Sequence, residues 1–240
     1  MNTGVEIIVG KRPEGILFDL GGTLLHDRIS GDLGARMRSR LDRQAFVPFV
    51  GEDLNLPQAL ADAMDATCRD GLREFHVKKW LEDHLPTGSG REGSPENLER
   101  FIRTEIIDYA PPPDARRVLR ELHALKLPMG VVSNSIFSSD LLRSDIRELS
   151  LMEAFRFVVS SAEFGLRKPH PAIFRDAVEK LGSNPAATWY VGDLWENDVA
   201  GSSRAGLLPV WLHPDAPVPP TYIPHFRAGN WAELGKLLGL

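Results

Sequence analysis

Five polar residues of this sequence lie where an apolar run ends or a turn begins, and their side chains could hold a cation and a phosphate group. Asp19 follows the run Gly-Ile-Leu-Phe, Ser133 follows Met-Gly-Val-Val, and Asp193 follows Trp-Tyr-Val-Gly. Asp198 comes five residues after Asp193, and Lys168 precedes a proline. Two carboxylates in one crevice would repel each other and would repel a phosphate dianion. A hard divalent cation removes both repulsions, and ligands that are all oxygen atoms suit Mg²⁺.

These side chains need elements that bring them together. Each apolar run is typical of a strand buried on both faces, as in a parallel sheet. Ligands bind outside the carboxyl ends of such strands, so we expect Asp19, Ser133 and Asp193 to converge in one crevice. After Asp19, Gly21 and Gly22 predict a turn that lets a ligand approach the backbone. Taken singly, each stretch also fits an ordinary strand end, and only their order favours a site.

The rest of the sequence predicts an α/β fold with a helical insert. Strand-like and helix-like segments alternate in the second half, which is typical of a Rossmann-like parallel sheet with helices on both faces. Pro169 is expected to open one of these helices at its first position. Apolar residues from about residue 33 to 109 recur at helical spacing, and no strand is evident there. We therefore predict a core of residues 1–26 and 110–240 and an all-helical insert of residues 27–109.

Composition narrows the classes of function. The 240 residues are 42% hydrophobic, enough for a proper core, and the net charge of -5 gives no basic bias toward nucleic acid. The single cysteine, Cys68, excludes an internal disulfide framework and fits a reducing compartment. The first dozen residues, with a possible edge strand at Val5–Val9, lack the apolar stretch of a signal peptide, and no run is long enough to span a bilayer. We expect a soluble, cytoplasmic protein without nucleic-acid or membrane partners.

In this order, Asp19, Ser133, Lys168 and the pair Asp193 and Asp198 resemble the motifs of the haloacid dehalogenase superfamily, whose members are mostly magnesium-dependent phosphohydrolases. The resemblance covers nearly the whole chain. The helical insert resembles the cap domain that closes over the substrate in this family, excludes water and chooses the leaving group. The resemblance implies a phosphatase-type hydrolase with Mg²⁺ as cofactor and a small phosphorylated metabolite as substrate.

The resemblance also implies catalytic roles. Asp19 would attack phosphorus and become an aspartyl phosphate. Ser133 and the adjacent Asn134 would hold a phosphoryl oxygen. Lys168 would neutralise charge on the nucleophile and on the transferring group, in a reaction that depends mainly on positioning and electrostatics.

The implied metal ligands come from the same motifs. They are the carboxylates of Asp19 and Asp193, the backbone carbonyl of Gly21, and Asp198 acting directly or through water. Asp198 fits equally well in the N-terminal turn of a helix, where carboxylates are favoured.

Gly21 departs from the family's pattern. The family's phosphatases carry a second aspartate at this position, which protonates the leaving oxygen and then activates water. General acid–base catalysis of this kind is typically worth ~10²–10⁴-fold. The departure predicts a slow enzyme, one selective for good leaving groups, or one with a substitute base such as His26. His26 also fits a loop residue that faces solvent.

Three alternatives stay open at this point. A catalytically impaired member could bind phosphate or a partner protein. A 2-haloacid dehalogenase also lacks the second aspartate, but the stretch from Asp193 to Asp198 resembles the magnesium-using version. A phosphonate-cleaving enzyme would need a lysine of the insert for a Schiff base. The candidates are Lys78 and Lys79, which also fit a solvated helix face.

Overall fold

A computed structural model of the chain describes residues 12–41, 46, 56–67, 69, 71–85, 93–212, 223 and 225–240. The predicted edge strand at Val5–Val9 and the single cysteine, Cys68, lie outside these residues. In the described part of the chain, no helix combines the length and the apolar character that a membrane span requires.

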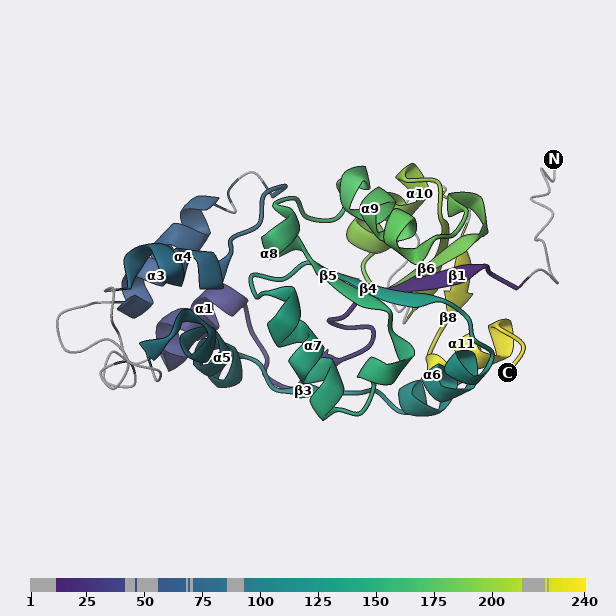
Figure 1. Cartoon of the computed structure of the whole chain (residues 1–240), viewed down its shortest axis with the longest axis horizontal. Coiled ribbons are helices and arrows are strands. Elements are labelled where there is room, and N and C mark those ends of the chain that lie inside the picture. The colour runs from purple at the N-terminus through teal and green to yellow at the C-terminus, as the bar shows by residue number, and fades with distance from the viewer. Residues whose placement is uncertain are drawn as a thin grey trace.

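A six-stranded parallel sheet forms the centre of the fold (Figure 1). The strand order is β5-β4-β1-β6-β7-β8. The strands are β1 (Gly15–Phe18), β4 (Met129–Ser133), β5 (Phe157–Ser160), β6 (Thr188–Gly192), β7 (Leu208–Leu212) and β8 (Phe226–Ala228). Phe18 pairs with Val131 on one side and with Val191 on the other. The central strand is therefore flanked by the two strands that lead to Ser133 and Asp193.

Helices cover both faces of this sheet, as predicted (Figure 1). One face carries α6 (Ala115–Ala124), α7 (Ser139–Glu148) and α11 (Trp231–Leu237). The other carries α9 (Pro171–Leu181) and α10 (Gly201–Arg204). Shorter helices are α8 (Ser161–Phe164), η3 (Met152–Ala154), η4 (Pro185–Ala187) and the π-helix η5 (Trp195–Ala200). Ile16 and Phe18 pack in one core and Leu17 in the other, because side chains alternate along a strand.

The prediction that Pro169 opens a helix is wrong. Helix α9 begins at Pro171, and the His170 side chain accepts a hydrogen bond from the backbone N–H of Ala172 at its start. The reason is local, because His170 itself precedes a proline and the α conformation is disfavoured there. Lys168 and Pro169 therefore stay in the loop before the helix, where they are joined by a cis peptide bond.

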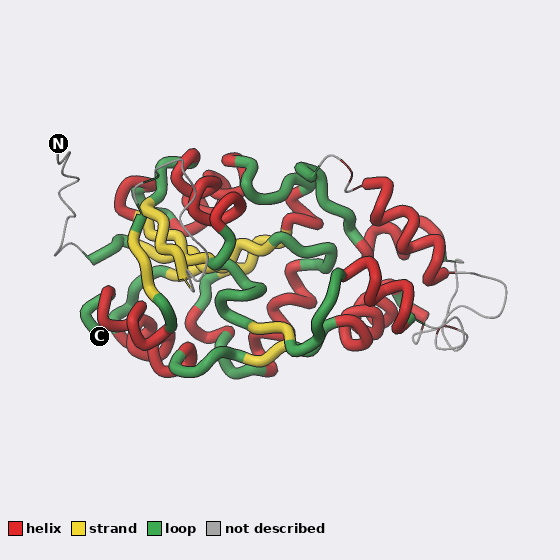
Figure 2. The backbone as a smooth tube through the Cα atoms, turned by 180° about the vertical axis from the view of Figure 1, so that it is seen from behind, coloured by secondary structure: helices red, strands yellow, loops and turns green. Residues whose placement is uncertain are grey.

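The helices that the structure describes between residues 33 and 106 lie beyond one end of the sheet (Figure 1, Figure 2). They are α1 (Leu33–Arg40), α3 (Leu56–Thr67), α4 (Val77–His84) and α5 (Pro95–Ile106). The chain leaves and returns through a two-stranded antiparallel ribbon of β2 (His26–Asp27) and β3 (Tyr109–Ala110). This ribbon was not predicted, because two-residue strands leave no pattern of alternation. The division into core and insert at residues 27 and 109 stays a prediction.

Polar contacts hold the helical insert to the sheet-containing part. The carboxylate of Glu99 in α5 accepts hydrogen bonds from Ser138 N and Oγ, at 2.6 and 2.7 Å. In the same helix, Arg103 Nε lies 2.8 Å from the carboxylate of Asp145 in α7. The Glu99 and Asp145 side chains are buried. Polar contacts thus join α5 of the insert to Ser138, which precedes α7, and to Asp145 within α7.

Candidate active site

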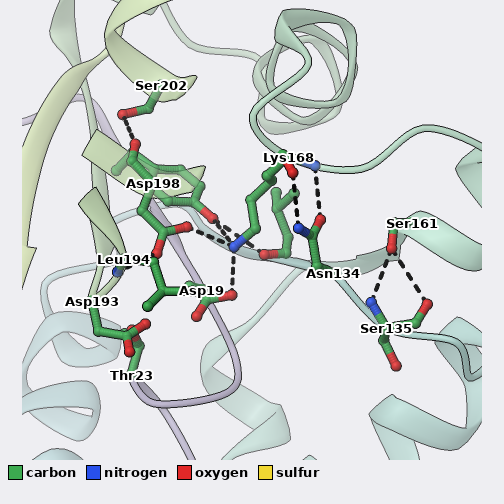
Figure 3. Close-up of polar contacts among 12 residues, drawn as sticks. Asp19, Thr23, Asn134, Ser135, Ser161, Lys168, Asp193, Leu194, Asp198 and Ser202 are labelled. Carbon is green, nitrogen blue, oxygen red and sulfur yellow. Dashed lines mark hydrogen bonds and ion pairs between the residues drawn. The ribbon is translucent and has the colours of Figure 1, made fainter. Parts of the chain in front are cut away.

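Three carboxylates meet at the carboxyl end of the sheet. Asp19 follows β1, Asp193 follows β6, and Asp198 lies in η5. One oxygen from each carboxylate lies within 4.8 Å of the others. Asp19 and Asp198 are buried, whereas Asp193 is partly exposed. The three predicted acidic residues therefore form one cluster (Figure 3).

Lys168 joins two of these carboxylates. Its Nζ donates to Asp19 Oδ1 at 2.5 Å, to Asp198 Oδ1 at 2.7 Å and to Tyr190 Oη at 2.9 Å (Figure 3). An ammonium group has three donors, so every N–H of Lys168 is used. The side chain is only 3% exposed, and this complete set of partners offsets the cost of burying its charge.

Asn134 fixes the backbone of Lys168. Its side-chain oxygen accepts from Lys168 N at 2.7 Å, and its amide nitrogen donates to Lys168 O at 2.9 Å. Both ends of the Asn134 amide thus contact the lysine's backbone. The role of Asn134 in holding phosphate stays a prediction, and the observed contact is one that positions Lys168.

Tyr190 is a site residue that the sequence analysis missed. It lies in β6, and its hydroxyl accepts from Lys168 Nζ and donates to Val132 O at 3.2 Å. Burial raises the pKa of Tyr190, although the charge of Lys168 opposes this effect, so the hydroxyl stays protonated and keeps its donor. A signal was present, because a tyrosine within a buried strand needs a partner for its hydroxyl.

The two glycines in the loop after Asp19, Gly21 and Gly22, are under different structural constraints. Gly22 has φ +81°, and an added Cβ would collide with the carboxylate of Asp193. Gly21 lacks both constraints: its φ is not positive, and an added Cβ would make only an ordinary contact, at 4.0 Å from Tyr109 Oη. Thr23 completes the loop, since its hydroxyl lies 3.5 Å from Asp193 Oδ1 and its carbonyl accepts from Trp231 Nε1 at 3.0 Å.

Ser133 ends β4, next to the strand that leads to Asp19. Its side chain is buried, and its hydroxyl has no hydrogen-bond partner among the described residues. A hydroxyl in this state is able to donate to a ligand oxygen, as its predicted role requires.

The site has more acidic than basic side chains. Burial raises the pKa of Asp19 to about 8, although Lys168 opposes that rise, and burial also raises the pKa of Asp193. Burial opposes the charge on Lys168, but Asp19 and Asp198 outweigh it and hold the lysine's pKa well above its usual value. Three carboxylates thus face one ammonium. A donor set made of oxygen atoms with excess negative charge fits a divalent cation such as Mg²⁺.

His26 contacts the loop rather than the carboxylates. Its Nε2 lies 3.1 Å from the carbonyl oxygen of Gly22. A carbonyl only accepts, so Nε2 carries a proton in this contact. Lys78 forms an ion pair with Glu96 at 3.0 Å and Lys79 with Asp83 at 3.7 Å, contacts that are typical of a solvated helix face.

Comparisons with known proteins place this site in context. Residues 16–211 match the family model described as haloacid dehalogenase-like hydrolase. A phosphoserine phosphatase from Thermus thermophilus is 32% identical over 164 residues, which cover 68% of this chain and 64% of the relative. A glyceraldehyde 3-phosphate phosphatase from Methanocaldococcus jannaschii is 25% identical over 207 residues, covering 82% of this chain and 83% of the relative. The chain thus spans slightly under two thirds of the Thermus protein.

The fold has a counterpart among solved structures. A 2-haloacid dehalogenase from Pseudomonas syringae matches with a TM-score of 0.63 at 20% identity, over 93% of this chain and 97% of that chain. A likeness at this identity shows the fold and does not decide between dehalogenase and phosphatase chemistry.

Proposed function

Because the chain belongs to the family of haloacid dehalogenase-like hydrolases, we propose that it is a magnesium-dependent phosphohydrolase of small phosphorylated metabolites. The observation that carries this proposal is the contact of one buried lysine, Lys168, with both Asp19 and Asp198. Relatives named phosphoserine phosphatase and glyceraldehyde 3-phosphate phosphatase support a phosphate ester as substrate. We place this activity in the cytoplasm.

In the proposed reaction, a carboxylate oxygen of Asp19 attacks phosphorus and the leaving group departs. The resulting aspartyl phosphate is then hydrolysed by water. Lys168 holds Asp19 Oδ1 in place and lowers the charge that the incoming phosphate meets. The hydroxyl of Ser133, which has no partner in the part of the chain that the structure describes, donates to a phosphoryl oxygen.

Asp19, Asp193 and the carbonyl of Gly21 would hold Mg²⁺, which when bound stabilises negative charge on the phosphoryl oxygens. Asp198 differs from the other two carboxylates, because both of its oxygens already have donors. Oδ1 accepts from Lys168 and Oδ2 accepts from Leu194 N at 2.9 Å. These contacts favour support of the metal through water over direct coordination by Asp198.

The test is hydrolysis of acetyl phosphate and p-nitrophenyl phosphate with and without Mg²⁺. We expect metal-dependent turnover, with acetyl phosphate the better substrate, and none with the Asp19→Asn variant. Folded wild-type protein that turns over neither substrate would contradict the proposal. Chloride release from a 2-haloacid without added metal would support dehalogenase chemistry instead.

Gly21 favours a second candidate, a catalytically impaired protein that binds phosphate or a partner protein. The Gly21→Asp variant distinguishes the two, and the absence of a steric clash for a Cβ at this position predicts that it folds. A large gain of phosphatase activity over an inactive wild type would support the second candidate. Efficient turnover by the wild type would exclude it.

A further inference from the structure

The missing side chain of Gly21 would point at the hydroxyl of Tyr109. A Cβ atom added to Gly21 would lie 4.0 Å from Tyr109 Oη, and no other described side chain or distant backbone atom is within that distance. Tyr109 lies in β3, where it pairs with Asp27 of the ribbon through which the chain leaves the sheet. A phenol therefore stands beside the loop of Asp19, on the side where residue 21 has no functional group of its own.

The ring of Tyr109 packs against the guanidinium of Arg103, whereas its hydroxyl forms no hydrogen bond with the described residues. The Arg103 guanidinium lies 4.9 Å from the ring centroid, and Arg103 is itself fixed by Asp145 at 2.8 Å. Among the described residues, Tyr109 Oη has no hydrogen-bond partner. Burial raises the pKa of Tyr109 against the opposing charge of Arg103, and the negative charges of Asp145, Asp27 and Asp19 add to the rise. The hydroxyl therefore keeps its proton at neutral pH and remains a donor.

Hydrolysis of an alkyl phosphate needs such a donor, because an alkoxide is a poor leaving group without a proton. His26 is less suitable, since its Nε2 proton is directed at the carbonyl of Gly22. Lys168 is also less suitable, since all its donors contact Asp19, Asp198 and Tyr190. Tyr109 combines an available proton with a position beside the nucleophile's loop.

We propose that Tyr109 protonates the leaving-group oxygen and then activates water, an inference that rests on the proposed phosphatase activity. In the first step, an Asp19 oxygen bonds to phosphorus, the bond from phosphorus to the leaving oxygen breaks, and the Tyr109 proton passes to that oxygen. An alcohol and a phenolate result. In the second step, the phenolate takes a proton from water while the water oxygen bonds to phosphorus and the bond to Asp19 breaks. Inorganic phosphate leaves and the phenol is restored.

The test compares Tyr109→Phe with wild type on acetyl phosphate and on an alkyl phosphate, β-glycerol phosphate. Acetate departs without a proton, so kcat/KM for acetyl phosphate should change less than about 3-fold, whereas kcat/KM for the alkyl phosphate should fall by ~10². A purely structural role for Tyr109 would not cause this selectivity.

Tyr190→Phe is the matched control, because it removes the other tyrosine hydroxyl near Asp19 but acts through Lys168. It should lower kcat/KM for both substrates by a similar factor. The double variant Tyr109→Phe with Gly21→Asp should recover alkyl phosphate hydrolysis, because a carboxyl group then occupies the same space. If Tyr109→Phe melts early, Tyr109→Leu provides a second variant without the hydroxyl.

Equal losses on both substrates, or no loss on the alkyl phosphate, would overturn the role of Tyr109 while leaving the phosphatase intact. Absence of wild-type turnover on acetyl phosphate would instead remove the proposed function, and this inference with it.

Discussion

The ammonium of Lys168 lies 2.5 Å from the carboxylate of Asp19, and the two side chains are only 3% and 8% exposed. They are 149 residues apart in the sequence. Their contact therefore depends on the loop before α9 being placed against the end of the central strand. The same ammonium reaches Asp198 at 2.7 Å, so one cation is shared between two buried acids.

Replacing Lys168 with methionine should damage both activity and stability. The change leaves two buried carboxylates without their cation, a loss of the kind that costs ~3–5 kcal/mol in free energy of unfolding. Turnover of acetyl phosphate should fall by roughly 10²–10³-fold, as when a charge-stabilising donor is lost. Chemical denaturation and steady-state kinetics measure the two effects. A Lys168→Met variant of wild-type activity would show that this contact has no part in catalysis.

Replacing Tyr190 with phenylalanine removes one acceptor from Lys168 and one donor from Val132 O. The free energy of unfolding should fall by about 1–3 kcal/mol, because a buried charged group and a buried carbonyl lose a partner. Urea denaturation checks this value. The Phe174→Leu variant, which changes the ring that packs edge-on against Tyr190 at 4.9 Å, separates loss of packing from loss of hydrogen bonds. A Tyr190→Phe variant as stable as wild type would mean that water replaces both contacts.

Magnesium should stabilise the folded protein independently of turnover. A ligand at 100 times its dissociation constant contributes about 2.7 kcal/mol to stability. We expect Mg²⁺ to raise the Tm, EDTA to reverse the rise, and the Asp193→Asn variant to reduce it strongly. Asp83→Asn, at an exposed side chain of α4, is the control that should respond like wild type. An undiminished rise in Asp193→Asn would place the ion elsewhere.

The burial of Asp145 predicts a dependence of stability on pH. Burial raises the pKa of Asp145 from 3.8 to about 6 against the opposing charge of Arg103, with Glu148 adding to the rise and Arg100 opposing it. Since the folded pKa is the higher one, the contribution of Asp145 to stability is complete below pH 3.8 and is lost as pH rises through 6. The loss is at most about 3 kcal/mol.

The Asp145→Asn variant should lack this component. Denaturation of both proteins from pH 4 to pH 7 should show the advantage of wild type over the variant shrinking as pH rises. Asp140→Asn, at the start of the same helix, is the control. A constant difference between wild type and Asp145→Asn across this range would contradict the shifted pKa.

The sheet and its acidic cluster could be predicted because their signals are local. The apolar runs of β1, β4 and β6 end at Asp19, Ser133 and Asp193, and parallel pairing brings neighbouring ends together. Tyr190 and Tyr109 could not be placed in the same way, since their importance depends on which loop lies opposite. Neither could the contact of Glu99 with Ser138, which joins a helix of the insert to a helix beside the sheet. Periodicity identifies the buried face of a helix but not its partner.

The error at Pro169 has a different origin. Pro169 and Pro171 both fit the first position of a helix, and the restriction that Pro171 imposes on His170 decides between them. The amide of Asn134 then holds the Lys168 backbone in the loop that results.

The backbone of Leu72 accepts a hydrogen bond from Arg167 N at 2.8 Å, and Arg73 pairs with Leu166 in an isolated antiparallel bridge. The insert therefore forms a backbone hydrogen bond with Arg167, the residue before Lys168. If the insert moves to admit a substrate, this hydrogen bond transmits the movement to the loop that carries Lys168. The contact of Lys168 with Asp19 is then weakened. Movement of the insert away from the site would then coincide with loss of the Lys168–Asp19 contact, and return of the insert would restore that contact.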